Sequence, residues 1–147
     1  MSVNATNSGP SLALVAALTR SHSALTRELD REITAHQLTA PQFAVLEILS
    51  RRGALPLHEV GKELLVSGGN VTCVVDNLEK AGLVVRTRDT QDRRVIRADL
   101  TPAGQERLAA IMPDYQARAA ALAAGLTDVE QGILVQLLRK LSDTVLP

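Results

Sequence analysis

The sequence predicts a mainly α-helical fold that carries one small β-hairpin, and three observations lead to this prediction. Apolar residues recur at three- and four-residue steps over most of the chain. Residues that cap helices stand before several of these segments. The pattern changes to strict alternation only within residues 83–100. A length of 147 residues suits one domain with a core of its own.

Composition restricts the class of protein further. The chain has 16 Lys and Arg against 16 Asp and Glu, and its single cysteine, Cys73, has no second cysteine with which to pair. The first ten residues contain neither the basic nor the apolar stretch of a secretory leader. No apolar run approaches the roughly 20 residues of a membrane span. We therefore expect a cytoplasmic protein that needs no disulfide, metal or cofactor to fold.

The amino-terminal segment is expected to be a short tail followed by a long helix. Residues 1–10 are small and polar and predict a disordered tail. Ser11 can cap the helix that follows. One apolar stripe runs along this helix, and it consists of Leu14, Leu18, His22, Leu25, Leu29, Ile33 and His36. A stripe of this length on a small protein requires a second helix to cover it.

Three helices are predicted in the middle of the chain. Thr39 and Gln42 form a capping box that starts a helix ending at Arg52 and Gly53. After the short extended link Leu55–Pro56, a brief helix runs from Leu57 to about Leu65. Ser67 then caps a helix that stops at Ala81 and Gly82. Two short helices so close together predict a helix-turn-helix.

The carboxyl-terminal third is predicted as a hairpin and two helices. Residues 83–88 and 94–100 alternate as two antiparallel strands around the polar residues 89–93. Thr101 and Pro102 start a helix that reaches Ala124, and Thr127 with Glu130 caps the last one. The apolar face of that helix consists of Ile133, Leu134, Leu137, Leu138, Leu141 and Val145.

The order of elements predicts a winged helix-turn-helix between helical ends. Residues 38–100 would form this lobe, and residues 11–37 with 101–147 would form a helical dimerisation region. Each end helix has an apolar stripe that one small lobe cannot cover, so burial against a second copy is expected.

Enzyme signatures are nearly absent. His58-Glu59 begins like a zinc metalloprotease motif, but Lys62 stands where the second histidine ligand would be. His22 and His36 have no second ligand one turn away, and no phosphate-binding glycine loop or nucleophile elbow occurs. We expect no enzymatic activity.

The helix after Ser67 has the features of a DNA recognition helix. Its apolar residues face inward, which turns Gly69, Cys73, Asn77 and Lys80 outward and leaves Ser67, Gly68 and Asn70 at its amino end. Small residues allow close approach to phosphate, and asparagine can pair with adenine in the major groove. An ordinary capped surface helix is the alternative for this helix alone.

Positive charge is concentrated in the hairpin and just before it. Residues 80–97 contain two anions, Asp89 and Asp92, and six cations, which gives a net charge of +4 in a neutral chain. A basic ribbon beside a recognition helix can contact the DNA backbone or the minor groove. A solvated charged turn is the alternative. The six cations are Lys80, Arg86, Arg88, Arg93, Arg94 and Arg97.

At this point the residues resemble the MarR family of bacterial transcription regulators. The resemblance lies in the order and spacing of five segments, strongest over residues 38–105. They are LTAPQFAVL from Leu38, SGGNVT from Ser67, VDNLEKAGLVVR from Val75, DRR from Asp92 and LTPAG from Leu100.

The resemblance implies a homodimer that binds pseudo-palindromic double-stranded DNA, usually as a repressor. It implies that Asp92 and Arg94 brace the wing and that arginine at the wing tip reaches DNA. The residues expected to contact DNA are Ser67, Gly68, Gly69, Asn70, Thr72, Cys73, Asn77, Arg88, Arg93 and Arg94.

The resemblance also implies a small aromatic or phenolic effector that releases the DNA. His22 is a candidate for the effector pocket, although a packed or interface histidine is the alternative. The first helix lacks the cysteine of the peroxide-sensing branch. Cys73 would be a small contact residue, with a redox switch as its alternative. A ligand-binding or structural dimer of the same fold without DNA affinity remains the other function.

Overall fold

The computed structural model describes residues 9–64 and 68–145, and it confirms the predicted mainly helical fold with a small sheet. The predicted order of helices and hairpin strands is correct, and one strand is added. The elements are α1 (Pro10–Ala35), α2 (Ala40–Arg52), β1 (Leu55–Pro56), α3 (Leu57–Leu64), α4 (Gly68–Lys80), β2 (Val84–Arg88), β3 (Ile96–Leu100), α5 (Pro102–Ala123) and α6 (Asp128–Val145).

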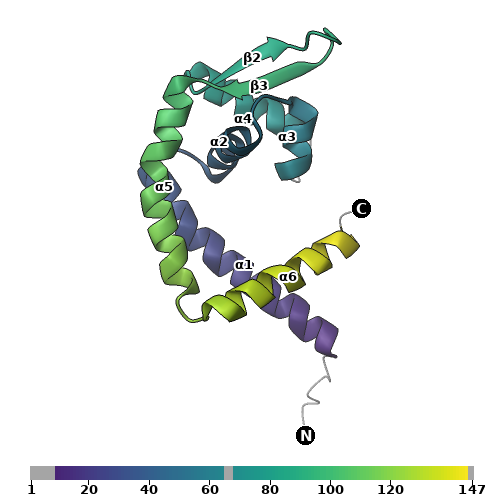
Figure 1. Cartoon of the computed structure of the whole chain (residues 1–147), viewed down its shortest axis with the longest axis vertical. Helices are drawn as coiled ribbons and strands as arrows, with labels where there is room; N and C mark the ends of the chain where they lie inside the picture. Colours follow the sequence, from purple (N-terminus) through teal and green to yellow (C-terminus); the bar gives the residue numbers. More distant parts are fainter. Residues whose placement is uncertain (1–8, 65–67, 146–147) are drawn as a thin grey trace, which may run out of the picture.

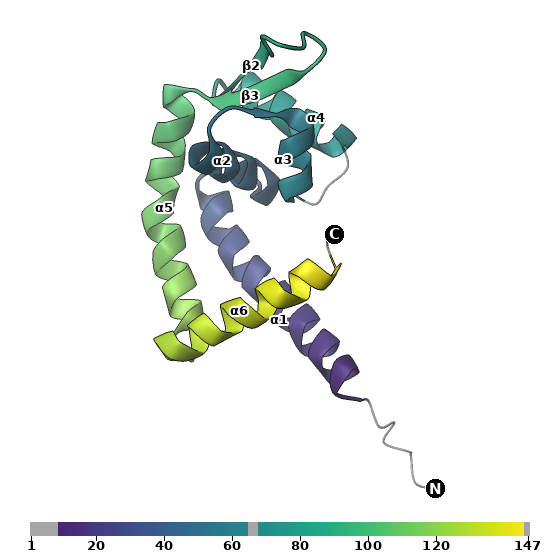
Figure 2. The same cartoon turned by 45° about the vertical axis from the view of Figure 1, so that its right-hand side comes forward.

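The elements divide into a lobe and a helical region. Figure 1 shows the sheet and α2, α3 and α4 gathered at one end, with the β2–β3 hairpin projecting beyond them. From this lobe α1 and α5 run side by side toward the other end, where α6 crosses α1 (Figure 2). Two long helices therefore join the lobe to α6.

The helix starts follow the capping residues with one exception. At α2, Gln42 N–H donates to Thr39 Oγ1 at 3.4 Å and Thr39 N–H donates to Gln42 Oε1 at 2.9 Å, so the predicted capping box is confirmed. The predicted cap at Ser11 is wrong, because α1 begins at Pro10 with Gly9 before it. Proline at the first position loses no hydrogen bond there. Residues 1–8 and the predicted cap Ser67 lie outside the described residues.

The sheet has three strands where two were predicted. In the order β1-β3-β2 both pairings are antiparallel, with Leu55 opposite Ala98 and Arg86 opposite Ala98 on the other side. Only an extended link was predicted at Leu55–Pro56, because two residues cannot show an alternating pattern. Arg97 Nη2 also donates to the Ala54 carbonyl at 2.7 Å, which ties the loop end of β3 to the residue just before β1.

The hydrophobic core lies in the lobe and not in the helical region. The buried apolar side chains come mainly from α2, α3, α4, the three strands, the end of α1 and the first half of α5. By contrast, α6 and the first half of α1 carry large apolar side chains that are exposed, such as Leu12, Val129 and Leu137. The helical region therefore leaves much apolar surface uncovered.

Two glycines lie where the first turn of α5 packs against the turn between α4 and β2. Gly82 has φ +72° and turns the chain from α4 into β2, as the sequence predicted. Gly104, in the first turn of α5, lies so close to this turn that an added Cβ would be 2.1 Å from the Leu83 carbonyl oxygen. Thr101 Oγ1 donates to the Gly82 carbonyl at 2.6 Å beside it. The start of α5 is thus fixed against the end of α4.

Within the described residues, no single helix is both long and apolar enough to cross a membrane. Only α5 and α6 taken together, bent by 97° at their junction, meet the length and composition of a span.

Candidate nucleic-acid interface

Helix α4 presents two different faces. Val71, Val75 and Leu78 are 0% exposed and pack in the core of the lobe. The residues on the other side are small or polar and exposed, and they are Gly69, Asn70, Thr72, Cys73 and Asn77. The helix begins at Gly68, while Ser67 is not described. The five residues of this face whose exposure the structure describes are therefore on the surface.

An arginine on β2 connects the wing to α4. Arg86 Nε and Nη2 donate to Glu79 Oε2 at 2.9 and 2.6 Å, and Nη2 also lies 2.5 Å from Asp76 Oδ1. The backbone N–H of Arg86 donates to Glu79 Oε1 at 3.2 Å. The guanidinium lowers the pKa of Glu79, and the Glu79 carboxylate raises the pKa of Arg86. We call these three side chains the α4–β2 clamp.

Asp89 organises the loop at the tip of the wing. Its Oδ1 accepts hydrogen bonds from the backbone N–H groups of Gln91 and Asp92, at 2.8 and 3.2 Å. Its Oδ2 accepts from Arg97 Nη1 at 3.1 Å. The two backbone donors and then Arg97 lower the pKa of Asp89. A carboxylate that accepts N–H groups two and three residues later forms a tight turn without a glycine.

Asp92 and Arg94 form a two-pronged ion pair on the wing. Arg94 Nε donates to Asp92 Oδ1 and Arg94 Nη2 to Oδ2, each at 3.0 Å, and the Arg94 backbone N–H also donates to Oδ1. The guanidinium lowers the pKa of Asp92. The Arg94 side chain is nevertheless 91% exposed, so its remaining N–H donors face solvent.

The positive charge available on the wing is smaller than the net charge of +4 suggests. Arg86, Arg94 and Arg97 each pair with a carboxylate, and Asp76 and Glu79 lie just before the segment that was counted. Among the described residues, Lys80, Arg88 and Arg93 have no carboxylate within ion-pair distance. Arg88 Nη1 instead donates to the Arg93 carbonyl at 3.2 Å.

A cavity of about 440 Å³ lies between α1, α2 and α5, where the lobe meets the helical region. Phe43 and Tyr115 stand at 4.7 Å between ring centroids in its wall, together with Asp30 and Glu47. Burial, and then the charges of Glu47 and Asp30, raise the pKa of Tyr115. His22, the predicted effector residue, is exposed on α1 and is not among the residues that line this cavity.

A second, apolar groove of about 370 Å³ lies between α1 and α6. Leucines from both helices line it, which are Leu14, Leu18, Leu134, Leu137, Leu138 and Leu141. These side chains belong to the two stripes that were predicted to need a second copy.

No group of three or more His, Cys, Asp or Glu side chains that could hold a metal ion occurs in the part of the chain that the structure describes. Lys62 follows His58 by one turn on α3, and both are exposed.

Comparison with known proteins gives a consistent result. The MarR family model matches residues 38–96. The uncharacterized HTH-type transcriptional regulator YkoM of Bacillus subtilis is 42% identical over 110 residues, which are 75% of this chain and 71% of YkoM. The chain belongs to the MarR family. It is therefore a DNA-binding transcription regulator of the winged helix-turn-helix type.

Two solved structures of MarR-type regulators are similar to this MarR family chain. A cysteine-to-serine mutant of Escherichia coli MarR in complex with operator DNA has a TM-score of 0.84 at 26% identity, covering 99% of this chain and 100% of the other. Bordetella bronchiseptica BpsR, whose DNA binding is regulated by 6-hydroxynicotinic acid, has a TM-score of 0.80 at 29% identity, covering 88% and 98%.

The sequence predicted helix α4 and the β2–β3 hairpin, but two features of this MarR lobe were not predicted. The α4–β2 clamp needs Asp76 and Glu79, three residues apart on one helix face, and Arg86 opposite them, which the count of charges did not consider together. The cavity gathers the single Phe and the single Tyr of the chain. That scarcity of aromatic residues was a signal that could have been followed.

Proposed function

We propose that two copies of this chain form a homodimer through α1, α5 and α6. The exposed apolar side chains of α1 and α6 support this, because a monomer would leave them in water at a cost of about 25 cal/mol per Å². Dimerisation is typical of the family. In this arrangement residues 11–37 and 101–147 form the dimerisation region and residues 38–100 form the DNA-binding lobe.

The dimer presents two copies of α4 to successive major grooves of a pseudo-palindromic duplex. The observation that carries this proposal is the outward face of α4, where Gly69, Asn70 and Asn77 are exposed beside a wing that the α4–β2 clamp holds in place. The two half-sites would be about 34–36 Å apart. Thr72, Cys73 and the amino end at Ser67 and Gly68 complete the contact surface.

The wing supplies contacts to the DNA backbone. Arg88 and Arg93 carry charges without a carboxylate within ion-pair distance in the described residues, and Arg94 keeps exposed donors although Asp92 braces it. Contacts to phosphate set the affinity for every duplex, whereas base contacts from Asn70 set the preference for one sequence.

A small aromatic effector releases the DNA by binding in the cavity between α1, α2 and α5. This cavity lies where the lobe joins the dimerisation helices, so a ligand that fits only one orientation of the lobe changes the distance between the two copies of α4. The regulation of BpsR by 6-hydroxynicotinic acid supports an effector of this size. His22 lies on α1 one helical turn before Thr26, which lines this cavity.

The protein would work in the cytoplasm as a repressor and not as an enzyme, in keeping with relatives that are transcriptional regulators. The alternative is a ligand-binding or structural dimer that has lost DNA affinity. Its support is the neutral net charge of the chain, together with the three wing and hairpin arginines already paired with carboxylates.

Selection of duplexes from fragments of the source genome by the purified protein separates the two functions. The regulator predicts enrichment of a two-fold symmetric sequence and a binding constant that falls steeply with salt. A folded dimer that enriches no sequence above non-specific background would support the alternative instead.

A further inference from the structure

The cavity between α1, α2 and α5 contains all the aromatic side chains of the chain. The sequence has one Phe, one Tyr and no Trp, and Phe43 and Tyr115 both line this cavity. Their ring centroids are 4.7 Å apart and their planes meet at 36°. The face of an aromatic ring is electron-rich and attracts cations at distances up to about 6 Å. Both rings of the chain are therefore packed together in the wall of one cavity.

Two carboxylates stand in the same wall. Asp30 comes from α1 and Glu47 from α2, and none of the described residues that line the cavity is positively charged. Glu47 Oε1 is 3.4 Å from Arg51 Nε, but that arginine also pairs with Glu63 at 2.8 Å. The negative charge of Glu47 is therefore only partly compensated.

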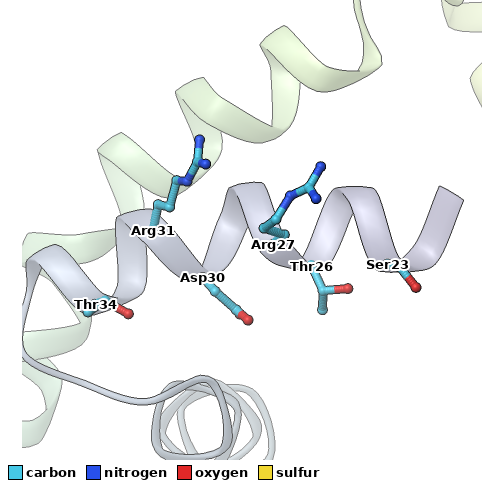
Figure 3. A pocket seen from close by; sticks show the side chains of 6 residues that line it. All are labelled: Ser23, Thr26, Arg27, Asp30, Arg31 and Thr34. Carbon is cyan, nitrogen blue, oxygen red and sulfur yellow. The ribbon is translucent and has the colours of Figure 1, made fainter. Parts of the chain in front are cut away.

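Asp30 is less compensated still. Within the part of the chain that the structure describes, it forms no hydrogen bond or ion pair. Figure 3 shows its side chain on the same side of α1 as Thr26, facing the helix that follows α1, while Arg27 and Arg31 leave α1 on the opposite side. Arg31 pairs with Glu28 at 3.1 Å. The charges of Asp30 and Glu47 both reach Tyr115, whose pKa they raise.

We propose that the effector of this cavity is an organic cation, an apolar body that carries a positively charged nitrogen. This inference rests on the proposed function, in which the cavity holds the effector. Aromatic faces and carboxylates both favour a cation, and the two effects act on the same group. An anion would lose its water between two carboxylates without a positive partner, which is costly. The cavity would thus differ from BpsR, whose named ligand is an acid.

The test compares three ligands of similar size and different charge by isothermal titration of the full chain. They are benzyltrimethylammonium, its neutral carbon isostere neopentylbenzene, and phenylacetate. We expect the cation to bind about tenfold more tightly than the neutral isostere, and phenylacetate to bind least. Equal or tighter binding of phenylacetate or of the isostere would overturn the proposal. Absence of binding by the cation at millimolar concentration would overturn it as well.

Charge-neutral variants locate the site. Asp30→Asn and Glu47→Gln should each weaken binding of the cation about tenfold and leave the neutral isostere unchanged. Glu106→Gln, which removes an exposed carboxylate from α5, is the matched control and should change neither. Because Tyr115 is the single tyrosine, its absorbance titration also shows whether each variant is folded and has lost a charge beside the ring.

The same protein is titrated with its selected duplex to separate the two proposals. Duplex binding without cation binding would overturn the inference about the ligand and leave the regulator in place. Cation binding without any duplex binding would support the inference about the ligand and contradict the proposed DNA-binding function.

Discussion

Replacing Gly104 by alanine is expected to destabilise the lobe through a direct clash with the backbone. The new Cβ would lie 2.1 Å from the Leu83 carbonyl oxygen, 3.0 Å from its carbonyl carbon and 3.2 Å from Leu100 Cδ2. The nearest atoms are backbone atoms, so rotating a side chain does not relieve the clash. The first turn of α5 must move away from the turn between α4 and β2.

The loss in the free energy of unfolding can be estimated from the overpacking and from the hydrogen bonds that this movement lengthens. Overpacking of this kind costs roughly 1–3 kcal/mol. The hydrogen bonds from Thr101 N–H to Leu83 O at 3.1 Å and from Thr101 Oγ1 to Gly82 O at 2.6 Å would also lengthen, at about 1 kcal/mol each. Alanine recovers up to about 1 kcal/mol of helix propensity. We expect a net loss of about 2–4 kcal/mol in the free energy of unfolding.

Urea unfolding followed by circular dichroism at one fixed protein concentration measures this loss. Gly69→Ala is the matched control, since it lies on the exposed face of α4 and an added Cβ meets nothing within 4 Å. That variant should be as stable as the wild type or slightly more so. If Gly104→Ala unfolds within about 0.5 kcal/mol of the wild type, the close approach of α5 to the α4–β2 turn does not exist.

Four further predictions follow from the interface, the wing, the cavity and the helical region. Gly69→Ala should bind the selected duplex more weakly than the wild type despite its unchanged stability, because a methyl group then separates α4 from the groove; unchanged affinity in a titration would place Gly69 away from the DNA. Arg93→Ala should reduce the steepness with which the binding constant falls with salt, by about 0.9 for each phosphate that the wing no longer neutralises. Arg86→Ala should leave this salt dependence unaltered, because Glu79 and Asp76 already neutralise the charge of Arg86. Equal changes in the two variants would contradict this assignment. Tyr115 should titrate above its ordinary pKa of 10.0 in absorbance measurements, and Asp30→Asn and Glu47→Gln should lower that pKa. The stability that the neutral form of Tyr115 contributes is complete below about pH 10 and is lost as pH rises through the higher folded-state pKa. An unshifted or lower pKa would show that the two carboxylates do not act on the ring. Leu137→Glu, at a position 58% exposed in the single chain, should convert the dimer to a monomer in sedimentation velocity experiments, and a dimer that survives this change would rule out α6 as the interface.

The sequence predicted the helical elements well because each one carries its own start, stop and period. Thr39 with Gln42 and Thr127 with Glu130 form capping boxes in the structure, and Gly82 ends α4 with a positive φ. These signals involve residues only a few positions apart, so they can be recognised in the sequence without knowledge of the rest of the fold. The predicted cap of α1 at Ser11 was two residues too late, because Pro10 occupies the first helical position and Gly9 precedes it.

Features that depend on residues far apart in the chain were not predictable in the same way. Strand β1 is defined by its pairing with β3, 43 positions away at Leu55 and Ala98, and its two residues show no pattern of their own. The cavity requires α1, α2 and α5 to meet, which places Asp30 beside Tyr115. Formal charge counting also failed at the wing, because the carboxylates that neutralise Arg86 belong to α4 and become its neighbours only after folding.

Binding of the wild type and of Asn70→Ala to the selected duplex and to a scrambled duplex tests the central claim most directly. If α4 reads bases in the major groove, the ratio of the two affinities should fall in Asn70→Ala by about fivefold to 150-fold per half-site, as expected when one bidentate pair between asparagine and adenine is removed. Binding to the scrambled duplex should stay the same, because the wing still reaches the phosphates. An unchanged ratio would contradict the account and would mean that the exposed face of α4 does not read the sequence.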